Sequence, residues 1–70
     1  MERTNVKSSN IKSVGYDEKT KTLEIEFHDG NVYQYSNVPK EKHIALMNAS
    51  SHGKYFHEFI RNNYTYKKLR

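Results

Sequence analysis

The stretch NVYQYSNVP, residues 31–39, holds two tyrosines two positions apart, between the turn sequence Asp29-Gly30 and the only proline of the chain. In an extended strand, residues two apart lie on the same face. Tyr33 and Tyr35 therefore point together, either toward solvent as a stacking platform or inward as part of a core. Their direction decides what kind of domain this chain forms.

The segment before the turn, KTLEIEFH at 21–28, is the clearest strand pattern of the chain. Leu23, Ile25 and Phe27 alternate with polar residues, which is typical of a strand with one buried face. A two-residue turn at Asp29-Gly30 would place both tyrosines opposite the acidic side chains of this strand.

A three-residue loop over 28–30, with Gly30 in the left-handed conformation, gives the other register. This loop pairs Ile25 with Tyr33 and Leu23 with Tyr35, so the tyrosines share a face with the apolar residues. Because burial of one face determines register, and this alternative buries far more apolar surface, it is the favoured one. The tyrosines are then predicted to point inward.

Two further patterns complete the predicted fold. The segment IKSVGYD (11–17) reads as a strand joined to the next by a polar reversal, and such short links connect antiparallel neighbours. After Pro39, KEKHIALMNAS (40–50) and KYFHEFIRNNY (54–64) have helical spacing, the second with a strong apolar face. We expect an α+β fold in which a three-stranded antiparallel meander is followed by two helices packed on one sheet face. The predicted core consists of Leu23, Ile25, Phe27, Tyr33, Tyr35, Phe56, Phe59 and Ile60.

Composition is consistent with one small domain. Only 34% of the 70 residues are hydrophobic, but 13% are aromatic and can supply the core. The absence of cysteine suits a reducing cytosol, and no segment approaches the length of a membrane span. We expect residues 1–7 to be flexible, residues 8–70 to form a single domain, and the chain to be a cytoplasmic monomer.

The charge is unevenly distributed. Residues 1–39 carry five basic and six acidic groups, whereas residues 40–70 carry seven basic groups and two acidic ones. This asymmetry favours an anionic partner for the second half. The alternative is a solvated basic tail that keeps a small protein soluble.

Catalysis and cofactor binding are poorly supported. The four histidines show no recognised ligand spacing, so neither a metal site nor a cofactor is predicted. Glu24 and Glu26 share a strand face without any sign of a cleft, and a solvated strand face explains them better. The three scattered glycines form no phosphate-binding loop. We therefore expect a non-catalytic domain.

Nucleic acid is the best candidate partner. Tyrosines alternate with cations in the second helix and tail, a mixture that single-stranded RNA readers use for stacking and backbone contact. The candidate residues are Lys54, Arg61, Tyr64, Tyr66, Lys67, Lys68 and Arg70. Alternatively, Tyr64 and Tyr66 anchor the tail to the core. A different class of function is also open, a protein–protein interaction module that docks on a larger partner through a sheet edge.

Several short motifs together resemble the KTSC domain, a module named for its place at the C-terminus of some lysyl-tRNA synthetases and also found as small bacterial proteins. The tyrosine pair and the following valine–proline match, as do the serine and glycine before the second helix. The matching positions are Tyr33, Tyr35, Val38, Pro39, Ser50, Gly53, Tyr55, Phe56, Ile60, Arg61, Tyr64, Tyr66, Lys67, Lys68 and Leu69. The resemblance covers about residues 8–69 and departs at Thr65, where the family tends to have proline. It implies a stand-alone, single-domain member, with RNA binding suggested by attachment of the family to a synthetase.

Overall fold

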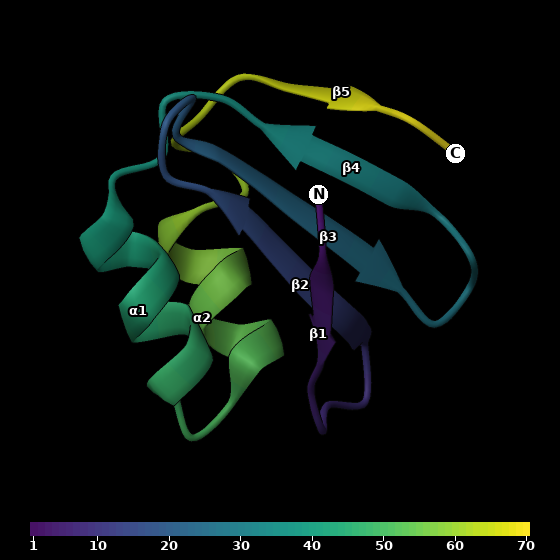
Figure 1. The fold of residues 1–70 in the computed structure, drawn as a ribbon. Coiled ribbons are helices and arrows are strands. Elements are labelled where there is room, and N and C mark those ends of the chain that lie inside the picture. The colour runs from purple at the N-terminus through teal and green to yellow at the C-terminus, as the bar shows by residue number, and fades with distance from the viewer.

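The computed structural model describes all residues, 1–70, as a curved antiparallel sheet with two helices on one of its faces (Figure 1). The elements in chain order are β1 (Arg3–Asn5), β2 (Ile11–Asp17), β3 (Thr22–Phe27), β4 (Val32–Tyr35), α1 (Lys40–Asn48), α2 (His52–Phe59) and β5 (Tyr66–Lys68). The α+β class and the placement of both helices on an antiparallel sheet confirm the prediction. Neither helix is long and apolar enough to cross a membrane.

The sheet has five strands in the order β1-β2-β3-β4-β5, not three. The meander β2-β3-β4 was predicted, but a three-residue strand is added at each edge. β1 comes from the segment expected to be flexible, and β5 comes from the tail, which returns to pair with β4 (Figure 1). Strands of three residues show too little alternation to be recognised, and the partner of β5 also lies far away in the sequence.

The register between β3 and β4 settles the direction of the two tyrosines. Ile25 pairs with Tyr33 and Leu23 with Tyr35, as the three-residue loop predicted. Gly30 has φ of 95°, a left-handed conformation that glycine adopts without steric cost. Its N–H donates to the carbonyl of Phe27 at 3.0 Å, which closes the loop. Both side chains therefore face the helices.

The core lies between the sheet and the helices. Leu23, Ile25, Tyr35, Phe56 and Ile60 of the predicted core are buried, and they are joined by Ile11, Val14, Val38 and Leu46. Phe27 and Tyr33 are half-buried and pack against this cluster.

Phe59 is a correction to the predicted core, because 43% of it is exposed. Phe56 of α2 and Ile60, the residue that caps this helix, are four residues apart and both buried, whereas Phe59 lies about 100° round the helix from Ile60. Its ring instead packs on the outer surface against Tyr55, with 4.8 Å between centroids, and under the ammonium of Lys42.

The start of α2 brings it close to the loop before β2. Ser51 is the N-cap, and its hydroxyl accepts a hydrogen bond from the N–H of Lys54 at 3.2 Å. Gly53 follows in the first turn, where an added Cβ would lie 3.4 Å from the side-chain nitrogen of Asn10. Asn10 and Gly53 both line the groove described next.

Candidate functional site

A groove of about 660 Å³ lies between α2 and the sheet. Five aromatic residues from four different elements line it: Phe27 of β3, Tyr33 and Tyr35 of β4, Phe56 of α2 and Tyr66 of β5. Polar residues complete the lining, among them Asn10, His28, Asp29, Asn31, His57, Arg61 and Asn62. An aromatic lining with a few polar groups is the usual composition of a ligand site.

The aromatic rings form a continuous wall. Tyr66 lies 5.6 Å between centroids from both Tyr33 and Tyr35, and Phe56 lies 5.4 Å from Tyr35 and 5.6 Å from Phe27. These separations fall in the range preferred by offset and edge-to-face aromatic pairs. Tyr66 is 59% exposed, so much of its surface stays free at the end of the wall.

Tyr35 is the most enclosed tyrosine of the groove, with only 4% of its surface exposed. Burial, with a smaller contribution from Tyr33 and Tyr66, raises the pKa of its hydroxyl to about 12. At neutral pH the hydroxyl therefore keeps its proton and can donate a hydrogen bond.

Arg61 supplies the positive charge of the groove. Its Nη1 lies 3.2 Å from Nδ1 of His57, one turn earlier in the chain, and no carboxylate pairs with it. The acidic group of the groove, Asp29, accepts from the backbone N–H and the side-chain amide of Asn31 at 2.9 and 3.0 Å. The guanidinium thus remains available to an anion.

The structure separates the residues predicted from the sequence as an RNA-binding set. Arg61 and Tyr66 line the groove, and Lys68 lies on the same face of β5 as Tyr66. Lys67 pairs with Gln34 and belongs to the other face of the sheet. Lys54 is exposed in the first turn of α2, and Tyr64 is half-buried against the core.

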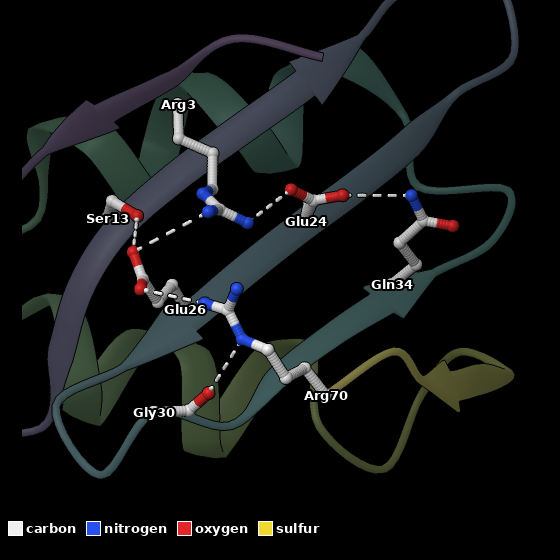
Figure 2. Close-up of polar contacts among 7 residues, drawn as sticks. All are labelled: Arg3, Ser13, Glu24, Glu26, Gly30, Gln34 and Arg70. Carbon is white, nitrogen blue, oxygen red and sulfur yellow. Dashed lines mark hydrogen bonds and ion pairs between the residues drawn. The ribbon is translucent and has the colours of Figure 1, made fainter.

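Arg70 is held by contacts on the face of the sheet that the helices leave uncovered (Figure 2). Its Nη2 lies 3.3 Å from Oε2 of Glu26, and its Nε lies 3.4 Å from the carbonyl oxygen of Gly30. The sequence suggested a free cation in the tail. Instead, the guanidinium of Arg70 connects the C-terminal end of the chain to the β3–β4 hairpin through Glu26 and Gly30.

The uncovered face also differs from the solvated acidic surface that the sequence suggested. Glu24 is only 6% exposed, and its carboxylate accepts from Nη1 of Arg3 at 2.6 Å and from Nε2 of Gln34 at 2.9 Å (Figure 2). Glu26 accepts from the hydroxyl of Ser13 at 2.8 Å. Arginines from the two ends of the chain thus neutralise two neighbouring carboxylates, and no local sequence pattern indicated either pairing.

These contacts change the titration of Glu26. The hydrogen bond from Ser13 lowers its pKa most strongly, the positive charges of Arg3, Lys12 and Arg70 lower it further, and desolvation opposes them. A carboxyl whose pKa is lowered by folding stabilises the protein above its unfolded pKa, and this stabilisation is lost as the pH falls through the folded value.

We therefore expect Glu26→Gln to make thermal stability less sensitive to acid. Between about pH 5 and pH 3 the Tm of the wild type should fall more steeply than that of the variant, because only the wild type must protonate this carboxylate. Glu18→Gln, which alters an exposed pair with Lys40, is the control and should keep the wild-type slope. Parallel Tm curves for Glu26→Gln and the wild type would contradict the assignment.

Comparisons with known proteins agree with this architecture. The KTSC domain family model matches residues 7–64. The crystal structure of a KTSC domain protein from Yersinia pestis superposes with a TM-score of 0.93 at 38% identity, covering 99% of this chain and 97% of the other. A small α+β domain with helices on one face of an antiparallel sheet is therefore shared by both. The chain belongs to the KTSC domain family.

Curated proteins of two kinds are similar to this chain in sequence. Lysine–tRNA ligase of Trichormus variabilis is 44% identical over 59 residues, and that of Nostoc punctiforme is 42% identical over the same length. This chain spans about a tenth of the length of these ligases. An uncharacterized protein of Stutzerimonas stutzeri is 37% identical over 70 residues and is matched over 99% of both chains.

Proposed function

We propose that this protein is a small non-catalytic domain that binds single-stranded RNA in the groove between α2 and the sheet. The observation that carries the proposal is that one groove is lined both by the exposed ring of Tyr66 and by the guanidinium of Arg61, which has no carboxylate partner. Base stacking on an aromatic ring and contact of a cation with phosphate are the two interactions that single-stranded nucleic acid needs.

The distribution of charge also supports an anionic ligand. Residues 40–70 hold seven basic groups against two acidic ones, and this segment forms α1, α2, β5 and the links between them. On β5, Lys68 shares the face of Tyr66, so Arg61 and Lys68 are the cations best placed for the backbone of a bound strand. Related domains within proteins named lysine–tRNA ligases add support, since those proteins act on an RNA.

The test replaces Arg61 and Lys68 together with glutamine and measures affinity for a single-stranded RNA across salt concentrations. Each phosphate contact on a single strand contributes about 0.7 to the log–log salt slope, so the double variant should flatten the slope by about 1.4. Lys19→Gln with Lys21→Gln is the matched control, because both lysines are exposed at the β2–β3 turn. That control should keep most of the slope.

Two results would oppose RNA binding at this groove. If the wild type binds RNA more weakly than about 100 μM at low salt, which is the weak end of non-specific binding, the function is not RNA binding. If the turn variants reduce the slope as much as the groove variants, binding is a diffuse charge effect. Both measurements require only purified protein and a labelled oligonucleotide.

A protein-interaction module is the second candidate, favoured by one observation. All three residues of β5 are exposed, and its outer edge is free to pair with a strand from a partner. Such docking should depend only mildly on salt, in contrast to phosphate contacts. The edge offers only three residues, so RNA binding remains the leading proposal.

A further inference from the structure

The aromatic wall of the groove contains a hydroxyl group, that of Tyr35, without a hydrogen-bond partner in the protein. Only 4% of the surface of Tyr35 is exposed, yet its hydroxyl makes no hydrogen bond within the chain. Because no fully buried polar side-chain atom lacks a partner, this oxygen must keep some accessible surface. Tyr35 lines the groove together with Arg61 and Tyr66.

Tyr16 shows how the same fold treats a tyrosine with a structural role. It packs on the core from β2, and its hydroxyl donates to the carbonyl oxygen of Val38 at 2.6 Å. That bond satisfies the hydroxyl within the protein. The hydroxyl of Tyr35 has no equivalent, although its residue is more enclosed, so its bonding capacity is left for a molecule in the groove.

The Tyr35 ring is held in place by its neighbours. The ring contacts Phe56 edge-to-face and lies beside Tyr66, while β4 is held between β3 and β5 by backbone pairing. A polar group fixed in this way at the base of an aromatic site discriminates between ligands, since a ligand without a matching group leaves it unpaired after its water is displaced.

We propose that Tyr35 is a specificity-determining residue, whose hydroxyl hydrogen-bonds the polar edge of one unpaired RNA base while that base stacks against Tyr66. The inference rests on the proposed function and adds to it that binding is selective for the base. The hydroxyl can donate to a ring nitrogen or carbonyl oxygen and can accept from an exocyclic amine. Arg61, on the rim, contacts the phosphate of the same strand.

The experiment measures the affinities of three RNA hexamers, of uridine, cytidine and adenosine, for the wild type and for Tyr35→Phe. The wild type should prefer one hexamer over the weakest by about fivefold or more, the value of one ordinary hydrogen bond. Tyr35→Phe keeps the ring and removes only the hydroxyl, so the preference should fall to about one while the salt slope stays unchanged. Tyr64→Phe, at a half-buried tyrosine that does not line the groove, should retain the preference.

A second measurement does not depend on a variant. The ring carbon that bears the Tyr35 hydroxyl should shift in the NMR spectrum with the preferred hexamer and shift less with the weakest one. Equal affinities for all three hexamers, a preference that survives Tyr35→Phe, or an unmoved ring signal would overturn base selection and leave RNA binding intact. If no hexamer binds, RNA binding and base selection both fail.

Discussion

Tyr35→Ala is expected to lower the free energy of unfolding by about 3–5 kcal/mol, as truncation of a buried aromatic residue does. Tyr35 is 4% exposed, and its ring contacts both Phe56 and Tyr66, so its loss opens a cavity between the sheet and α2. A domain of this size has a total stability of about 4–10 kcal/mol. A substantial unfolded population should therefore be visible at 25 °C by circular dichroism or urea titration.

Tyr33→Ala is the matched comparison, because Tyr33 lies two residues earlier on the same strand face but is only half-buried. Less apolar surface is lost there, so the destabilisation should be clearly smaller. A loss below about 1 kcal/mol for Tyr35→Ala would mean that the aromatic wall contributes little to stability. Equal losses for the two variants would mean that the difference in burial does not determine the cost of truncation.

Glu24→Ala is expected to have the next largest effect, a loss of about 2–3 kcal/mol. Two donors, Nη1 of Arg3 and Nε2 of Gln34, lose their acceptor, and hydrogen bonds to a charged group are each worth about 1.5–3 kcal/mol. The side chain of Arg3 is 27% exposed, so water partly compensates the guanidinium, and the loss stays below that of a fully buried pair. Urea titration at neutral pH measures it.

Glu18→Ala provides the contrast. Its carboxylate pairs with Lys40 at 3.3 Å, but more than half of each side chain is exposed. Exposed pairs contribute about 0–1 kcal/mol, so the loss should stay within that range.

A double-mutant cycle of Glu24→Ala with Arg3→Ala should show a coupling energy, because the two side chains interact directly. Additive losses would show that Glu24 acts without Arg3, through Gln34 or packing alone.

The central part of the fold was predictable because its signals are local. Alternation in 21–28, a glycine suited to a left-handed loop and a helical apolar face after Pro39 are each contained within a few residues. The inward direction of Tyr33 and Tyr35 followed from one comparison, the apolar surface buried in each of two registers. The candidate site was only partly predictable. Arg61 and Tyr66, two of the candidate residues, line one groove, and Tyr35 is buried as predicted, but the groove itself could not be foreseen from local patterns.

The class of fold and the register of the central hairpin follow from the sequence, because short-range periodicity and turn chemistry specify them, and the family follows from the resemblance of its short motifs. The edge strands, the groove and the roles of the charged ends depend on contacts that exist only in the folded chain. β1 and β5 are too short to have a period, and they form because strands already in place offer them backbone partners. Arg70 and Glu26 are 44 residues apart, and only the assembled sheet brings their charges together. An ion pair depends on distance in space. The residues next to Arg70 in the sequence therefore could not show that it pairs with Glu26, and it was predicted as a phosphate ligand instead.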